Sequence, residues 1–451
     1  MLYILIVFLA IAHNAMAGEL TAEISKIPLE ISFAQGNGGS IIATDVDNNG
    51  SYDLIVTERG YIGAYATNGK LLWSRRLDIR LSEHAEIHGL PGLHGPGVQA
   101  GDINGDGKIE VLFLDQESRV RVLRGDTGQD LWSIKLEPPS GAKQWEHLVI
   151  ANFRGKGDRD LLLQATNKMG YRMGRYIGAY SLESLQAGKR VPLWQRDDFG
   201  ACAHSGARVA DLDGDGRDEV LGATILSPEG NILVKVDIQG HLDSLTVADV
   251  RSDFPGLEVV MLEEGILNRI FLVGHGGVIW NTAHKKRLEP QNSVVGHFTN
   301  ERTNMQIWCR SRQNTYQTPF VFNGYGHLFA EYIMNDVIPP DWSTTGIEEI
   351  SPIHWTGKKH HLACAKERHK ADDVTIFDPI SGRFMLRIHE KASRLYVADI
   401  LGDWREEIIV ANENQLHIYS NPQINPRPGQ PPLWSQPHYR RSKMTWNYYN
   451  P

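Results

Sequence analysis

The sequence has few cysteines, and their spacing excludes the usual roles of paired cysteines. Only Cys202, Cys309 and Cys364 occur among 451 residues. An odd number of widely separated cysteines rules out a disulfide framework. The chain also lacks the CxxC and Cys/His spacings of zinc sites. We therefore interpret all three as small buried hydrophobic residues.

Long apolar runs and an excess of positive charge are also missing. The apolar run of residues 2–12 is too short to span a bilayer, which needs ~20 residues, and no similar run follows. The small-x-small pattern of residues 15–17 fits a cleavage site, so residues 1–17 are predicted to be a signal peptide. We expect a secreted or periplasmic monomer without stable membrane insertion. The net charge of −8 argues against nucleic acid as a partner.

Helical periodicity is nearly absent, whereas glycine is abundant. The 44 glycines are about 10% of the chain, against a usual ~7%. Much of this excess belongs to an internal repeat. Each copy has a short apolar strand, an Asp/Gly turn and a second apolar strand. Clear copies occupy residues 41–56, 98–114 and 208–223, and degenerate copies occupy 149–164, 246–261, 293–308, 349–364 and 396–411.

The repeat predicts the fold. A unit of three or four strands recurring about every 51 residues is typical of a propeller blade. Eight copies predict an all-β, eight-bladed β-propeller over residues 18–420, with seven blades as the alternative. Residues 29–33 are expected to complete the last blade, and the Pro-rich residues 421–451 to form a strap across the outside. We thus expect one closed domain, rather than the roughly three domains that the length alone indicates.

Three of the Asp/Gly turns have the FG-GAP-like pattern D-x-[DN]-x-[DN]-G-x-x-[DE]. Oxygens at positions 1, 3, 5 and 9 of a tight loop converge on one point, which suits Ca²⁺, and the glycine at position 6 permits the bend. The alternative is ordinary Asp/Gly turn chemistry without an ion. Arg154 takes the second ligand position in the third repeat, so that turn is predicted to hold no ion. The predicted ligands are Asp45, Asp47, Asn49 and Asp53; Asp102, Asn104, Asp106 and Glu110; and Asp211, Asp213, Asp215 and Glu219.

Histidines recur just before the turns, where the innermost strand of each blade begins beside the central axis. Four histidines at one phase of the repeat predict a site at this hub. They are His94, His147, His204 and His241.

One blade adds carboxylates to this histidine pattern. Asp243 lies on the same side of a strand start as His241, and Glu264 ends the strand that pairs with it. With His204 from the neighbouring blade, these residues form a candidate shell for one metal with open positions. Mixed His/carboxylate shells suit Zn, Mn or Ni more obviously than Ca, so the spacing alone leaves the ion undecided.

Basic and aromatic residues lie near the same expected hub. Tyr171, Arg172 and Arg175 follow the third repeat, and Lys391 and Arg394 precede the last one. Each of them taken singly is equally well explained as a solvated loop residue.

Two segments carry a resemblance to a known family. Residues 240–264 (GHLDSLTVADVRSDFPGLEVVMLEE) and 395–410 (LYVADILGDWREEIIV) resemble the propeller rhamnogalacturonan lyases. The resemblance extends over about residues 30–420 and is most specific in the DWREE run of residues 403–407. It implies a secreted, calcium-containing, eight-bladed enzyme that cuts rhamnogalacturonan by β-elimination. It also implies that the hub ion is Ca²⁺, because the family binds calcium through residues that match His204, His241, Asp243 and Glu264.

The chain departs from that family in three respects. It has no room for the β-sandwich and the loop insertions that are usual there. The family's basic residue before the last repeat corresponds only loosely to Lys391 or Arg394. Gln291 and Asn292 stand where another basic residue would be expected.

β-Elimination on a uronic-acid polysaccharide needs three groups. A cation must neutralise the carboxylate, a base must take the C5 proton, and an acid must protonate the leaving O4. The hub metal would supply the first, assisted by Arg172 or Arg175. The candidates for the base are Lys391 and then His147, and those for the acid are Tyr171 and His94.

Three other functions stay open at this point. The first is a non-catalytic propeller that binds glycans or proteins at the cell surface, although a scaffold has no need of a histidine ring. The second is a lyase acting on another uronate polymer such as ulvan. The third is a hydrolase, in which Asp243 and Glu264 would act as a carboxylate pair without metal.

Overall fold

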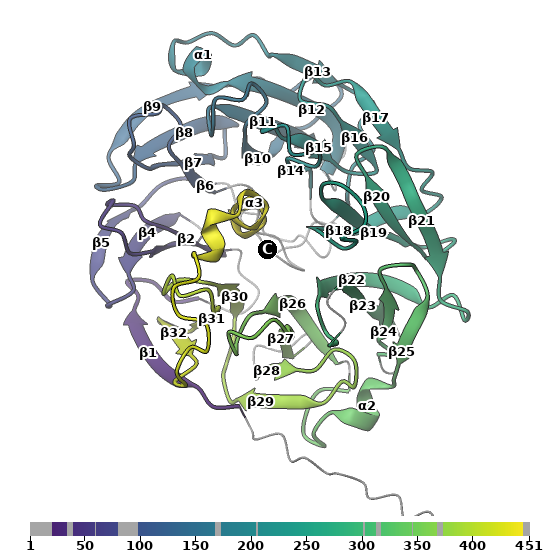
Figure 1. Ribbon diagram of the computed structural model, residues 1–451. Coiled ribbons are helices and arrows are strands. Elements are labelled where there is room, and N and C mark those ends of the chain that lie inside the picture. The colour runs from purple at the N-terminus through teal and green to yellow at the C-terminus, as the bar shows by residue number, and fades with distance from the viewer. Residues whose placement is uncertain are drawn as a thin grey trace, which may run out of the picture.

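The computed structural model describes residues 20–33, 39–58, 60–79, 98–166, 173–203, 206–300, 303–312, 317–344, 346–367 and 373–444. Within these ranges the chain forms eight antiparallel sheets of four strands, arranged radially around a central axis (Figure 1). The predicted eight-bladed β-propeller is confirmed, and the seven-bladed alternative is wrong. The helices of the described residues are short, namely α1 (Leu182–Gln186), α2 (Met334–Val337), the 3₁₀ turn η1 (Leu433–Ser435) and α3 (Pro437–Met444).

The blades follow one another in chain order, each built from the hub outward. The first four consist of β2 (Gly39–Thr44), β3 (Asp53–Glu58), β4 (Tyr61–Ala66) and β5 (Leu71–Arg75); β6 (Gln99–Gly101), β7 (Glu110–Leu114), β8 (Arg119–Arg124) and β9 (Asp130–Lys135); β10 (Trp145–Ala151), β11 (Asp160–Thr166), β12 (Met173–Ser181) and β13 (Trp194–Arg196); and β14 (Arg208–Ala210), β15 (Glu219–Leu221), β16 (Thr224–Leu226) and β17 (Ile232–Lys235).

The last four blades have the same plan, except that the eighth takes its outer strand from the N-terminal side of the chain. They consist of β18 (His241–Ala248), β19 (Glu258–Glu264), β20 (Arg269–Gly274) and β21 (Gly277–Ala283); β22 (Glu289–Gly296), β23 (Gln306–Arg312), β24 (Phe320–Asn323) and β25 (Leu328–Glu331); β26 (Ile347–Ile353), β27 (Leu362–Glu367), β28 (Val374–Phe377) and β29 (Phe384–Ile388); and β30 (Arg394–Ala398), β31 (Glu407–Asn412), β32 (Gln415–Ser420) and β1 (Glu23–Pro28).

Burial within a blade follows the position of the strand. The second strands are covered on both sides by neighbouring blades, and β3, β11 and β19 are buried along their whole length. Outer strands such as β17 leave most side chains exposed. Runs such as VVML in β19 therefore read as continuous apolar stretches rather than as alternating ones.

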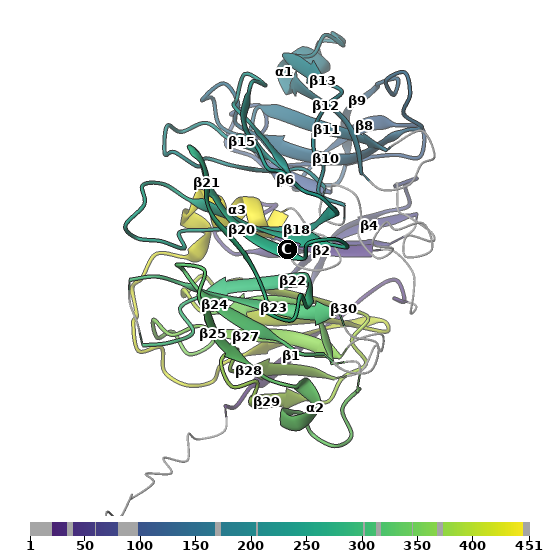
Figure 2. The same ribbon diagram turned by 90° about the vertical axis from the view of Figure 1, so that its right-hand side faces the viewer.

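The chain after β32 turns inward. Helix α3 lies near the central axis, on the face of the ring that carries the Asp/Gly turns, and it packs against β2, β14 and β18 (Figures 1 and 2). Its Arg440 and Arg441 pair with Asp158 in the third turn, and Arg441 also lies 2.8 Å from Asp218 after the fourth turn. The expectation that the C-terminal segment forms a strap across the outside is therefore wrong. These ion pairs hold α3 at the hub.

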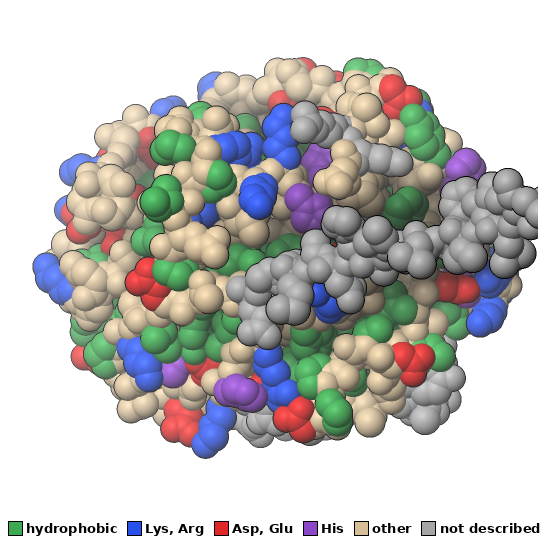
Figure 3. Space-filling model, turned by 60° about the horizontal axis from the view of Figure 1, so that its bottom comes forward, with side chains coloured by type: hydrophobic (Ala, Val, Ile, Leu, Met, Phe, Trp, Pro, Cys, Tyr) green, Lys and Arg blue, Asp and Glu red, His purple; other side chains and the backbone are tan. Residues whose placement is uncertain are grey.

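Figure 3 shows a face on which acidic, basic and hydrophobic side chains are interspersed, with some Lys, Arg and His side chains close together in its upper part. Among the described residues, no helix combines the length and the apolar character needed to cross a lipid bilayer.

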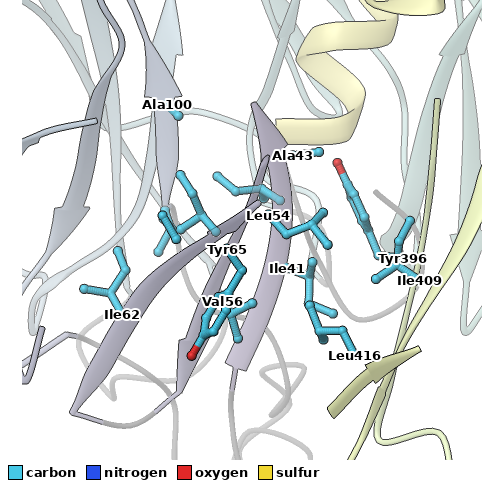
Figure 4. Close-up of a cluster of buried hydrophobic side chains, with 14 of the residues drawn as sticks. Ile41, Ala43, Leu54, Val56, Ile62, Tyr65, Ala100, Tyr396, Ile409 and Leu416 are labelled. Atoms are coloured by element: carbon cyan, nitrogen blue, oxygen red, sulfur yellow. The ribbon is translucent and has the colours of Figure 1, made fainter. Parts of the chain in front are cut away.

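Strand β1 closes the ring by pairing antiparallel with β32, from Glu23 opposite Ser420 to Pro28 opposite Gln415. The expected closing strand at residues 29–33 is thus placed too late in the chain. The core is continuous across this joint: Ile41 and Leu54 of the first blade pack in one cluster with Tyr396, Ile409 and Leu416 of the last (Figure 4). The first and last blades thus meet through packed side chains rather than through paired strands.

Candidate functional site

A β-bulge interrupts the two innermost strands of four blades, at the end of the strands away from the Asp/Gly turns. A bulged residue leaves the regular alternation, so its side chain is aimed in a new direction. In these blades the bulged residue is polar and buried. The four residues are Glu146, Asp243, Gln291 and Glu349. The bulges thus gather polar groups at one end of the hub.

The predicted cluster on β18 and β19 forms as the strand pairing requires. His241 and Glu264 are register partners, and His241 Nε2 lies 3.0 Å from Glu264 Oε2 and 3.5 Å from Asp243 Oδ1. One ligand atom of each of the three residues lies within 4.8 Å of the others. The structure therefore brings together three of the four predicted hub ligands. The fourth, His204, lies outside the described residues.

The charges of this cluster fit a divalent cation. Asp243 and Glu264 are buried, and burial together with the neighbouring Glu264 raises the pKa of Asp243 well above its usual range. Hydrogen bonding to Asp243 and Glu264 raises the pKa of His241 to about 9, because its proton then balances the two carboxylates. A cation bound to the same three atoms would take over that role. Two carboxylates and one imidazole are a donor set that divalent metals accept.

Behind Glu264, a chain of hydrogen bonds links three blades. Gln291 Nε2 donates to Glu264 Oε1 at 3.3 Å. Arg310 donates to Gln291 Oε1 at 2.9 Å and to Glu348 Oε1 at 2.8 Å, and its side chain is fully buried. Arg310 is the register partner of Asn292. The strand paired with residues 291–292 thus carries a basic residue, which the sequence analysis did not single out.

Arg394 does not reach the surface of the hub. Its side chain is 3% exposed, and its Nε donates to the carbonyl oxygen of Gly39 at 3.2 Å across the joint between the last and first blades. Burial raises the pKa of the nearby Glu349, and the positive charges of Lys366 and Arg394 partly offset this rise. Lys366 Nζ lies 3.8 Å from Glu349 Oε1. Sequence reasoning missed Lys366, which belongs to an otherwise apolar strand. The prediction that Arg394 acts directly in catalysis is therefore wrong, because its side chain is buried at the joint between the last and first blades.

His147 is also buried, with 2% exposure. Its Nε2 lies 2.9 Å from the carbonyl oxygen of Ala207 in the next blade, and burial lowers its pKa to about 4. This contact turns the ring toward the neighbouring blade, so the geometry favours a packing role over that of a base.

Two other candidates are exposed and lie in separate ion pairs. Lys391 Nζ is 3.6 Å from Glu413 Oε1, and Arg175 is 3.6 Å from Asp197 Oδ2. Both side chains are more than 70% exposed, so these pairs contribute little to stability. The remaining catalytic candidates, His94, Tyr171 and Arg172, lie outside the described residues, as does the predicted signal peptide.

The three predicted calcium turns share one geometry at their first and last ligands. The first aspartate accepts two backbone N–H bonds within the turn, as Asp45 does from Asn49 at 3.0 Å and from Gly50 at 2.8 Å. The last carboxylate accepts from the residue after that aspartate, as Glu219 does from Leu212 at 2.8 Å. Burial, opposed by that bond and reinforced by nearby carboxylates, raises the pKa of these last carboxylates to about 7. They are Asp53, Glu110 and Glu219.

Carboxylate oxygens converge in two of these turns. Asp45, Asp47 and Asp53 bring ligand atoms within 4.8 Å of one another, and so do Asp211, Asp213 and Asp215. In the remaining turn, the Asn104 amide donates to Asp106 and Glu110 at 3.3 Å. All three turns therefore offer the oxygen-rich loop that Ca²⁺ prefers.

Two neighbouring groups modify this picture. His275, on the β20–β21 hairpin of the next blade, lies 3.4 Å from Asp213 and forms a further cluster with it and Glu219. The sequence did not reveal it because the contact crosses between blades. In the third repeat, Arg154 Nε donates to Asp160 Oδ1 at 2.7 Å. Its guanidinium thus supplies positive charge in the turn predicted to hold no ion.

Comparison with known proteins identifies the family. The model for "Rhamnogalacturonan lyase family 11, C-terminal domain" matches residues 194–450, which is more than half of the chain. The chain belongs to rhamnogalacturonan lyase family 11. Membership of this family supports the predicted polysaccharide lyase and does not favour the non-catalytic alternative.

Relatives of this family 11 protein include two curated enzymes of Bacillus subtilis (strain 168). It is 24% identical to the rhamnogalacturonan exolyase YesX over 435 residues, covering 83% of this chain and 70% of that one. It is 23% identical to the rhamnogalacturonan endolyase YesW over 446 residues, covering 83% of this chain and 66%, just under two thirds, of that one.

Solved structures show the same fold. The crystal structure of YesX matches with a TM-score of 0.71 and 19% identity, over 94% of this chain and 80% of that one. The rhamnogalacturonan lyase PL11 of Bacillus licheniformis matches with a TM-score of 0.64 and 18% identity, over 95% and 82%. At this identity the likeness concerns the propeller itself.

Proposed function

We propose that this family 11 protein cleaves the backbone of a rhamnogalacturonan-type polysaccharide by β-elimination, at the end of the hub that carries His241, Asp243 and Glu264. The observation that carries the proposal is the convergence of one imidazole and two buried carboxylates within 4.8 Å, in a member of a polysaccharide lyase family. The names of the relatives YesX and YesW support rhamnogalacturonan as the polymer.

The three residues would hold a divalent cation, which we take to be Ca²⁺. When bound, such an ion neutralises a uronate carboxylate and so makes the proton on C5 easier to remove. The protein's own contribution is to fix the ligands. Gln291 and Arg310 hold Glu264 from behind, and the bulge aims Asp243 toward His241. Preorganised ligands of this kind avoid a reorganisation cost during the reaction.

Lys391 is the base in this proposal. It lies in the loop before β30, at the same end of the blades as His241, and its amine is exposed. The elimination moves the C5 proton to the base, forms the C4–C5 double bond and breaks the bond from C4 to O4. A proton returned to O4 completes the balance, and His94 and Tyr171 remain the proposed donors. Lys366 is the second candidate for the base, because it lies at the bulged end of its blade, the same end of the blades as His241.

Calcium in the turns and the destination of the protein belong to the same proposal. We assign Ca²⁺ to the three FG-GAP-like turns because each has four oxygen-bearing ligand positions, and carboxylate oxygens converge in two of them. We also propose that residues 1–17 direct the protein out of the cytoplasm and that it acts as a monomer.

A lyase assay across a panel of polymers tests this function. Each elimination leaves a conjugated uronate, so ultraviolet absorbance should rise with rhamnogalacturonan and depend on added Ca²⁺. Homogalacturonan and ulvan serve as the other uronate polymers, and activity on ulvan alone would reassign the substrate. Folded, calcium-loaded protein that releases no unsaturated product from any polymer would contradict the proposal.

A further inference from the structure

A cavity lies beneath the C-terminal segment, on the face of the ring opposite the His241 cluster. It measures about 770 Å³, which is within the ~300–1,000 Å³ typical of small-molecule sites. Its wall includes the ends of β18, β22 and β26 together with residues of η1 and α3. Ala248 lines it at the far end of β18 from His241. Seven residues of strand separate the two, or roughly 23 Å at ~3.3 Å per residue, so the cavity is distinct from the hub cluster.

Trp404 marks this cavity as more than a packing gap. It occupies position 6 of the turn that begins at Asp399, where the three predicted calcium turns have Gly50, Gly107 and Gly216. Its φ of 73° is left-handed, as are the 88°, 81° and 85° of those glycines. A bulky residue in this region costs about 1–3 kcal/mol. A glycine would satisfy the turn without strain, whereas the indole lines the cavity and packs against the His354 ring at 4.5 Å.

Arg427 provides a positive charge that no carboxylate of the described residues balances. Its guanidinium carbon lies 3.9 Å from the centre of the Trp404 ring, and its Nε donates to the carbonyl oxygen of Gly357 at 2.6 Å. Its buried Nη2 has no hydrogen-bond partner among the described residues. Burial lowers its pKa, and no acidic group opposes that shift. Lys358 and Lys359 line the same cavity and are exposed.

Among the described residues, the acidic group in the wall is already neutralised. Glu406 lies 3.0 Å from Lys443 Nζ and accepts hydrogen bonds from the Tyr439 hydroxyl and the His354 backbone N–H, both at 2.9 Å. The cavity therefore keeps a net positive charge from Arg427 and the two lysines. An anion would find a complementary charge here.

Three histidines complete the wall with neutral polar groups. The His354 and His361 rings lie 4.0 Å apart, and the His297 and His361 rings lie 5.5 Å apart. Burial lowers the pKa of all three, to about 3 for His354. The Nδ1 atoms of His297 and His354 are buried without a hydrogen-bond partner among the described residues. Buried polar atoms of this kind are rare and call for a ligand or water.

We propose that this cavity is a second binding site, for a small saccharide that carries a carboxylate. Arginine recognises a carboxylate through two parallel N–H bonds, and the free Nη2 of Arg427 is placed for one of them. The free imidazole nitrogens suit sugar hydroxyls, and the Trp404 indole provides apolar surface for a sugar ring. The choice of a uronate rests on the proposed function, whereas the site itself rests on the cavity.

Titration calorimetry with digalacturonic acid tests the site independently of turnover. We expect saturable binding, a loss of at least tenfold in affinity for Arg427→Gln, and a comparable loss for Trp404→Gly. Glycine fits the left-handed turn, so the second variant should still fold, and a melting curve confirms this before binding is measured. Arg190→Gln is the matched control, because Arg190 is an exposed arginine that donates to a carbonyl oxygen, that of Lys135, on the outer rim. It should bind like the parent protein.

The ligand panel separates the contributions to recognition. Galactobiose, which lacks the carboxylate, and inorganic phosphate, which lacks the sugar ring, should each bind at least tenfold more weakly than digalacturonic acid. Binding in Asp243→Asn should be unchanged although its turnover is lost, which separates this site from the lyase site. The proposal is overturned if digalacturonic acid does not bind saturably, if Arg427→Gln binds it unchanged, or if either probe binds equally well.

Discussion

His241 Nε2 lies 3.0 Å from Glu264 Oε2, directly across the β18–β19 pair. The contact places a partly exposed imidazole against a buried carboxylate, with Asp243 as a second buried carboxylate beside them. In the absence of a cation the proton on His241 balances this charge, and the raised pKa of about 9 expresses that balance. The same three atoms are thus suited to hold either a proton or a metal ion.

The first prediction concerns Asp243→Asn. Removing one ligand should abolish calcium-dependent turnover, with a fall of at least 100-fold. In chelator the variant should melt no lower than the parent protein, because the substitution removes a carboxylate whose burial is unfavourable. Melting curves with and without Ca²⁺, beside the lyase assay, check this. Lys285→Gln, in an exposed ion pair with Glu331, is the control and should change neither property.

The second prediction separates two classes of calcium. Mild chelation should remove hub activity before the melting temperature falls, because the hub shell leaves open positions for substrate whereas each turn surrounds its ion with oxygens of one tight loop. Activity and melting temperature measured across a chelator titration would show two transitions. If both properties vanished together at every chelator concentration, the assignment of separate structural and catalytic ions would be wrong.

The fold was predictable because the repeat fixes the strand pairs. Each Asp/Gly turn joins two apolar strands. The first turn begins at Asp45 and the last at Asp399, and the blades between them close into a ring. The pairing of β18 with β19 then placed His241 opposite Glu264 without knowledge of the structure. Contacts within one blade are local in sequence, which is why this part of the site followed from spacing.

Contacts between distant blades were not predictable in the same way. Arg440 reaches Asp158 across 282 residues, so nothing local indicated that the tail turns inward. Arg310 was hidden for a related reason. Its partners Gln291 and Glu348 lie on two other strands, at or beside bulges that the sequence does not reveal. The position of Trp404 in the repeat was visible, but its meaning depends on the left-handed backbone.

The third prediction concerns the buried pair of Arg310 and Glu348. Arg310→Met leaves Glu348 buried beside an apolar side chain, and breaking such a pair costs about 3–5 kcal/mol in the free energy of unfolding. Arg310→Met combined with Glu348→Gln removes both charges and should recover a large part of that loss. Denaturant unfolding of the two variants measures the difference. Equal destabilisation of both would show that the charge pair is not the cause.

The fourth prediction concerns the pH dependence that His147 confers. Burial lowers its pKa from 6.5 to about 4 in the folded protein, so between these values the unfolded chain binds a proton that the folded chain does not. The free energy of unfolding should therefore fall as the pH falls from 6.5 to about 4, by up to ~1.4 kcal/mol per pH unit from this residue. His147→Gln removes the titration, so the stability difference between parent and variant should shrink from pH 7 to pH 5. Denaturant unfolding at both pH values, with saturating Ca²⁺ throughout, measures this difference. A constant difference would mean that burial does not hold His147 in its neutral form.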